Sequence, residues 1–150
     1  MAKHQVRTSK VIDPGGHFSQ AVAIPARGVL VFVSGMTARR PDGTIAGIGD
    51  IEEQTRQVCE NIRHAVEAAG GTMDDICRVD VYLRNLGDSE RVNKVRRHFF
   101  RVPPPASTVV EVSKLASPEF LVVMNAIAVV SPEVSAAVSP RAPSAIPPPA

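Results

Sequence analysis

The sequence has few aromatic residues, few cysteines and little net charge. It contains no Trp, one Tyr and five Phe in 150 residues, so Val, Ile, Leu and Ala must fill the core. The two cysteines, Cys59 and Cys77, lack the spacing of a metal site, and they indicate thiols in a reducing compartment. A net charge of +2 does not require a nucleic acid or a membrane as a partner. No apolar run is long enough to span a bilayer, and we expect a cytoplasmic, single-domain protein without metal or cofactor.

The clearest predicted element is a helix between Asp50 and Gly71. Asp50 can cap its N-terminus, and Glu53 three residues later completes a capping-box-like pair. Small and apolar residues recur at helical spacing from Val58 to Ala69, so one face should pack on a sheet. The two glycines at 70 and 71 end the helix.

Apolar, β-branched runs predict strands on both sides of this helix. Ser19–Ile24 and Val29–Ser34 are separated by Pro-Ala-Arg-Gly, which predicts a hairpin. The run over Leu121–Val130 is apolar on both faces apart from Asn125, which is typical of a central strand. Further strands are predicted near Lys10–Ile12, over Ile76–Leu83 and over Ser107–Val112.

A second, shorter helix is predicted from Ser89 to about Phe100. Its inward face should carry Val92, Val95 and Phe99, and its other face Arg91, Lys94, Arg96 and Arg97. The element order indicates an α+β fold: a mixed sheet with both helices on one face. The opposite sheet face then needs cover, which oligomerisation would supply. We expect a loosely ordered N-terminus at 1–14, a domain at 15–130 and a disordered Pro/Ala-rich tail at 131–150.

Six short motifs follow one another between His17 and Val130. They are Phe18-Ser19-Gln20-Ala21-Val22 (compare PYSQAV), Phe32-Val33-Ser34-Gly35 (VSGQ), Gln54-Thr55 to Asn61-Ile62 (QTxQxxxNI), Val92-Asn93 to Phe99-Phe100 (VNxxYxxFF), Pro105-Ala106 to Val112 and Ala126 to Val129. In this order they resemble the motifs of the RidA family, also called the YjgF or L-PSP family. The resemblance implies a chorismate-mutase-like fold and a homotrimer with a central barrel and a ligand cleft at each subunit interface.

The resemblance implies a chemistry as well as a fold. Family members hydrolyse a reactive imine or enamine to a ketone and ammonia, with no metal or bound cofactor. An arginine binds the substrate carboxylate bidentately, and a carboxylate or backbone group positions the water. The loop from Thr37 to Asp42 and Arg56 resemble the 2-aminomuconate deaminase branch.

The sequence departs from the family pattern at the positions that carry this chemistry. The family arginine follows Pro-Ala, where this chain has Ser107. The two glutamate positions of the last strand hold Val123 and Asn125, and the tyrosine of PYSQ is Phe18. These changes together predict a changed and less charged substrate cleft. Compensation could come from Arg39, Arg40 or Arg101, or all three could be solvated surface residues.

We therefore name two candidate catalytic residues, Asn125 and Ser107. Asn125 is either a site residue or a satisfied buried amide, and Ser107 is either a nucleophile or a hydrogen-bonded serine in the cleft wall. The candidate substrate-binding residues are Phe18, Ser34, Gly35, Met36, Arg39, Asn93 and Val123.

Three functions remain open on the sequence. The first is a deaminase acting on an imine, an enamine or an aminomuconate-like metabolite. The second is a non-catalytic trimer that binds a small molecule at the subunit interface or acts as a chaperone-like or regulatory protein. The third is an RNA-directed protein, since Arg91 to Arg101 is basic, although the rarity of aromatic residues disfavours nucleic acid as a partner.

Overall fold

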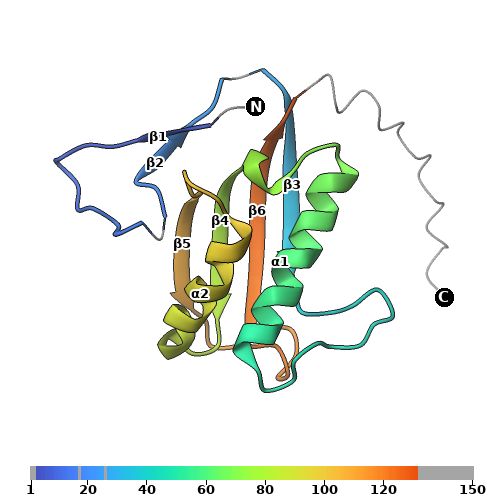
Figure 1. Ribbon diagram of the computed structural model, residues 1–150. Coiled ribbons are helices and arrows are strands. Elements are labelled where there is room, and N and C mark those ends of the chain that lie inside the picture. The colour runs from blue at the N-terminus through green and yellow to red at the C-terminus, as the bar shows by residue number, and fades with distance from the viewer. Residues whose placement is uncertain (1–2, 17, 26, 132–150) are drawn as a thin grey trace.

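The computed structural model describes residues 3–16, 18–25 and 27–131. Strands β3, β6, β4 and β5 form a sheet in that order, in which only the β4–β5 pair is parallel. Both helices cover the same face of this sheet, which confirms the α+β class with a mixed sheet (Figure 1). The elements are β1 (His4–Val6), β2 (Ala21–Ala23), β3 (Val29–Met36), α1 (Ile51–Ala68), β4 (Ile76–Leu83), α2 (Ser89–Phe99), β5 (Ala106–Glu111) and β6 (Val122–Val130), with 3-10 turns at Met73–Asp75 and Leu86–Asp88.

The first helix begins and ends where its capping residues predict. The Asp50 carboxylate accepts hydrogen bonds from the backbone N–H groups of Glu52 and Glu53, and so satisfies two donors that have no partner within the helix. The chain leaves the helix through Gly70, whose φ of 83° suits glycine. The fully buried residues Val58, Ile62 and Val66 pack this helix onto the sheet.

The last strand, β6, is the central strand that its apolar sequence predicts. It pairs with β3 on one side and with β4 on the other. Side chains of β4 alternate between the helix-covered core, where Val79 and Val81 are fully buried, and the opposite face.

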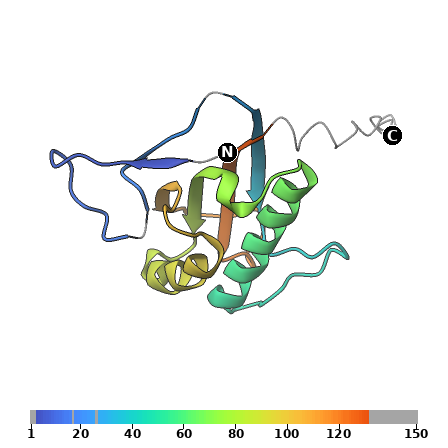
Figure 2. The same ribbon diagram turned by 45° about the horizontal axis from the view of Figure 1, so that its top comes forward.

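The predicted hairpin between Ser19–Ile24 and Val29–Ser34 is wrong. β2 instead pairs with β1, with His4 opposite Ala23, and β3 pairs with β6. The strand expected near Lys10–Ile12 is likewise misplaced, because β1 lies at His4–Val6. The β1–β2 ribbon lies beside the β5 edge of the main sheet in both views (Figures 1 and 2).

The sheet face opposite the helices carries exposed apolar side chains. On β3, Val33 points to the core and is 6% exposed, whereas Leu30 and Phe32 are 59% and 72% exposed. Val110 of β5 is also exposed. A face of this kind is typical of an oligomer interface. No described helix is long and apolar enough to cross a membrane, and the predicted tail lies outside the described residues beyond 131.

Candidate functional site

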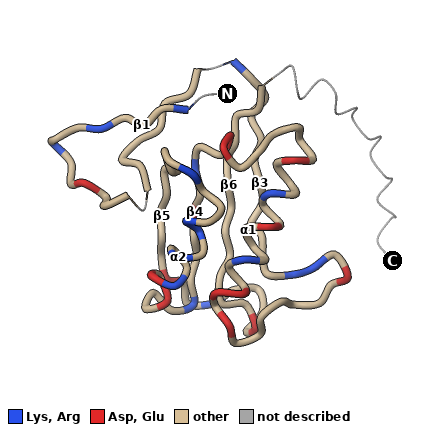
Figure 3. The backbone as a smooth tube through the Cα atoms, viewed as in Figure 1, with Lys and Arg blue, Asp and Glu red and all other residues tan. Residues whose placement is uncertain are grey.

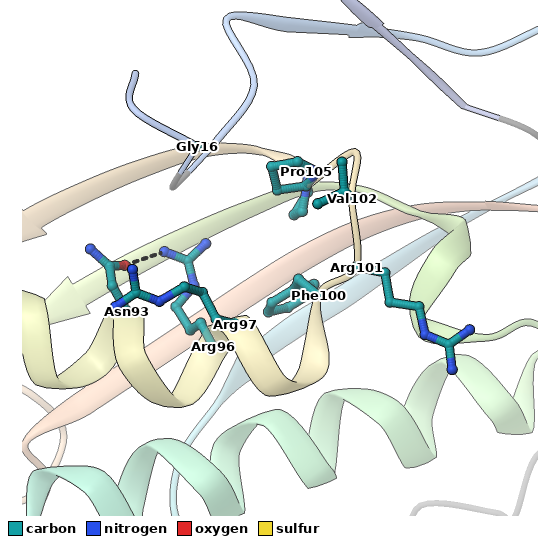
Figure 4. Close-up of a pocket in the computed structure, with 9 residues that line it drawn as sticks. Gly16, Asn93, Arg96, Arg97, Phe100, Arg101, Val102 and Pro105 are labelled. Carbon is teal, nitrogen blue, oxygen red and sulfur yellow. Dashed lines mark hydrogen bonds between the residues drawn. The ribbon is translucent and has the colours of Figure 1, made fainter. Parts of the chain in front are cut away.

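A pocket of about 280 Å³ lies between α2 and the segment that leads into β5 (Figure 4). Its size is at the small end of the range for small-molecule sites. The lining residues are Gly16, Asn93, Arg96, Arg97, Phe100, Arg101, Val102, Pro104 and Pro105.

The central charged group of this pocket is Arg96, which is only 5% exposed. The prediction that Arg96 lies on the solvent face of the second helix is therefore wrong. It follows Val92 by four residues and precedes Phe100 by four, and this spacing puts it on the buried face of α2. The spacing could have revealed this from the sequence. Arg91, Lys94 and Arg97 are exposed, as predicted.

The guanidinium of Arg96 is held by neutral groups. Nη1 donates to Asn93 Oδ1 at 3.1 Å, the dashed contact of Figure 4, and Nη2 donates to Ser107 Oγ at 2.9 Å. The guanidinium carbon lies 5.6 Å from the centre of the Phe100 ring, within cation–π range. Nε is buried without a hydrogen-bond partner among the described residues.

Ser107 meets Arg96 because it points to the helix-covered face of the sheet. Its Cα partner on β4 is Val79, a fully buried core residue. The hydrogen bond to Arg96 fits the interpretation of Ser107 as a bonded serine in a cleft wall.

The pocket thus contains a buried positive charge without a counter-charge in the described chain. No described Asp or Glu forms an ion pair or hydrogen bond with Arg96, and burial lowers the pKa of its guanidinium. An unpaired charge in a low-dielectric site favours binding of an anion. Residue 107 is an uncharged serine, but the pocket beside it contains the guanidinium of Arg96. The expectation of a less charged cleft at the subunit interface stays a prediction.

Four of the other candidate residues gather on the opposite face, at a bulge in β3. Val33 pairs with Ala126 and Met36 with Met124, so Ser34 and Gly35 together face the single residue Asn125. A Cβ on Gly35 would lie 3.1 Å from Val123 Cγ1, a tight contact that a small shift of the Val123 side chain would have to relieve.

The two candidate catalytic residues therefore do not meet within one chain. Asn125 has Asp80 as its Cα partner, whereas Ser107 has Val79, and these neighbours on β4 point to opposite faces. Asn93 and Ser107 form one group with Arg96, while Ser34, Gly35, Val123 and Asn125 form the other, with half-buried Met36 at the end of β3.

Phe18 lies in the segment next to the first group. Its neighbour Ser19 is 2% exposed, and the Ser19 hydroxyl donates to the Pro104 carbonyl at 2.5 Å. This bond holds the segment against the rim of the pocket. The Phe18 side chain itself is 38% exposed.

The three arginines considered as replacements for the family arginine are exposed. Arg39 stacks on Phe120 at 5.4 Å and donates to the Gly43 carbonyl, away from the pocket residues. Arg40 donates to Thr44 within the same loop. Arg101 lines the pocket, but it pairs with Asp74 at 3.6 Å and its side chain is 84% exposed.

Acidic and basic positions lie close together around the start of α2 (Figure 3), and several of them form ion pairs. Arg91 lies within ion-pair distance of Asp50, Glu52 and Asp88, and Lys94 pairs with Glu52. These contacts leave less free charge near the start of the helix for phosphate groups.

The remaining reactive groups do not form a second site. Burial raises the pKa of the Cys59 thiol to about 12, and burial also raises the pKa of Cys77. Both side chains are therefore neutral thiols at pH 7. Within the described ranges no three His, Cys, Asp or Glu side chains group as a metal site would require.

Comparison with known proteins gives matches over nearly all of the described chain. The family model for endoribonuclease L-PSP matches residues 8–130. A RutC family protein of Pyrococcus abyssi is 39% identical over 85% of this chain and 98% of its own length. A 2-iminobutanoate/2-iminopropanoate deaminase of Dermatophagoides farinae is 32% identical over 75% of this chain and 86% of its own.

Solved structures give the same result for the fold. A Yersinia pestis protein of the conserved Rid family, of unknown function, superposes with a TM-score of 0.78 at 25% identity, covering 87% of this chain and all of its own. RidA of a Psychrobacter species superposes with a TM-score of 0.64 at 30% identity, covering 85% and 99%. The matched ranges include α2, β5 and β6, which position both groups of candidate residues.

Proposed function

This chain belongs to the Rid family, also called the YjgF or L-PSP family, and from that premise we propose that it is a cofactor-independent deaminase. Its substrate is a small imine or enamine that carries a carboxylate. The observation that supports this function is the buried guanidinium of Arg96, which lines the pocket with no acidic partner in the described chain. A relative that matches three quarters of this chain carries the name of an imine deaminase.

The reaction is hydrolysis of a C=N bond. Water adds to the imine carbon and a proton passes to nitrogen; the carbinolamine then expels ammonia and leaves a ketone. Because water itself completes the chemistry, the protein contributes by holding the substrate and orienting the water. Asn93 accepts from Arg96 through its oxygen and keeps its two amide N–H donors for a substrate or water oxygen.

The proposal includes a homotrimer whose sheets form a central barrel, with the ligand at the subunit interface. Exposed Leu30, Phe32 and Val110 support it, because they give the uncovered sheet face an apolar surface that a second subunit would bury. Family membership supports the same assembly.

A second candidate function is binding of a small carboxylate without turnover. It is favoured by the neutral residues Val123 and Asn125 at the family's two glutamate positions, and by the absence of any acidic side chain from the described pocket lining. A missing acidic group would leave the water without a base.

The test is release of ammonia and ketone from freshly generated 2-iminopropanoate and 2-iminobutanoate, with an arginine-bearing Rid protein as the positive control. We expect a rate above the uncatalysed background that rises in proportion to protein concentration. If both substrates are hydrolysed only at the uncatalysed rate while the protein still binds 2-oxobutanoate, the deaminase proposal is wrong and the binding function is supported.

A further inference from the structure

Two positions that contact each other beside the pocket both depart from the family motifs. The helix motif VNxxYxxFF, aligned on Val92-Asn93 and Phe99-Phe100, has tyrosine where this chain has Arg96. The strand motif has arginine after Pro-Ala, where this chain has Ser107. In the structure the two side chains are joined by a hydrogen bond of 2.9 Å.

The two changes together keep a guanidinium at this place, but the helix supplies it instead of the strand. Ser107 is small, and it leaves space at the start of β5 that a longer strand residue would fill. The guanidinium of Arg96 reaches that place from α2 and bonds to the serine hydroxyl. The strand position thus lacks an arginine, and a helix position that contacts it has one.

Arg96 also has unused capacity to bind a ligand. A guanidinium has five N–H donors, and the hydrogen bonds to Asn93 and Ser107 use two of them. Nε is among the donors without a partner in the described chain. A buried arginine whose role was only structural would be expected to pair with an acidic side chain.

We propose that Arg96 is the residue that binds the substrate carboxylate, and that Ser107 and Asn93 are positioning residues that hold its guanidinium toward the pocket. This inference rests on the proposed function for the identity of the substrate. It makes the site selective for carboxylates that are small enough for a pocket of about 280 Å³.

The experiment measures binding of 2-oxobutanoate, a stable product-like carboxylate, by titration calorimetry, together with turnover of 2-iminobutanoate. We expect Arg96→Met to weaken binding roughly tenfold to a hundredfold, the effect of losing a charge-assisted hydrogen bond. The charge-matched control is Arg91→Met, which removes an exposed arginine from the same helix and should change binding less than twofold.

Two further variants keep the test decisive if Arg96→Met does not fold. Arg96→Tyr alone should lose binding, and Arg96→Tyr combined with Ser107→Arg should recover it to within about threefold of the wild type, since the pair restores the family arrangement. A folded double variant that fails to recover binding would overturn the inference. So would a folded Arg96→Met variant with wild-type affinity, or loss of binding in Arg97→Met instead.

The two readouts separate this inference from the proposed function. Binding of 2-oxobutanoate that depends on Arg96, in a wild-type protein without turnover, would sustain the inference and end the deaminase proposal. Turnover by the wild type that persists unchanged in Arg96→Met would support the deaminase proposal and overturn the inference about Arg96.

Discussion

Ser107→Arg introduces the family arginine into a place that Arg96 already occupies. The Arg96 Nη2 atom lies 2.9 Å from Ser107 Oγ, so a guanidinium on residue 107 meets another of the same charge. Two unit charges about 4 Å apart repel by about 4 kcal/mol at an effective dielectric constant near 20. A long side chain relieves part of this by turning toward solvent, and we expect a loss of about 2–4 kcal/mol in the free energy of unfolding.

The assay is urea unfolding followed by circular dichroism, at one protein concentration because assembly also contributes to stability. Ser107→Ala is the control for the lost hydroxyl, which bonds to a charged donor and contributes about 1.5–3 kcal/mol. In the Arg96→Tyr background, Ser107→Arg should cost at least 2 kcal/mol less than in the wild type, as a double-mutant cycle measures.

The refuting result is a cycle with no coupling. If Ser107→Arg cost the same with tyrosine or arginine at position 96, the two side chains would not share one space. The inference that Arg96 fills the space of an arginine at position 107 would then be wrong.

Two other predictions concern the uncovered face and the buried thiol. Phe32→Lys places a charge at a residue that is 72% exposed on the uncovered sheet face, and it should lower the molar mass measured by light scattering from that of a trimer to that of a monomer. The control is Ile48→Lys, at a loop residue that is 65% exposed, and it should leave the molar mass unchanged. A Phe32→Lys protein that is still trimeric would contradict the proposed interface. Because the pKa of Cys59 is about 12 in the folded protein against 9.0 for a free thiol, only the unfolded chain releases this proton as pH rises above 9. From pH 9 to about 10.5 the wild type should lose about 1.6 kcal/mol more unfolding free energy than Cys59→Ala in urea titrations. Equal losses would show that the thiol has the same pKa in the folded and the unfolded protein.

The sequence predicts correctly those helices and strands whose ends and buried faces are set by residues nearby in the chain. The capping carboxylate of Asp50 and the glycine at 70 set the limits of α1, so its bounds agree with the sequence to within two residues. Strand β4 matches its predicted range because alternation of apolar residues reports burial of one face.

Strand partners are a different problem, because they depend on residues far along the chain. Val29 to Met36 pairs with β6, about a hundred residues later, although a short Pro- and Gly-containing segment before it is typical of a hairpin. Whether Asn125 and Ser107 lie on the same face of the sheet also depends on strand pairing and cannot be read from the sequence. Each lies on a predicted strand, but only the register through β4 shows that they point to opposite faces.

The site itself shows why a gap in a motif is weak support for a missing function. A motif follows positions along one strand, whereas a binding site is a set of atoms that several elements bring together. On β5 the guanidinium is absent at Ser107; in space it is present, because Arg96 lies one helical turn from both Val92 and Phe100 and faces the same serine. Residue type alone predicts that Arg96 faces solvent, whereas its helical spacing predicts that it faces inward. Burial of an unpaired charge is costly, so a buried arginine without an acidic partner is a candidate for binding a ligand.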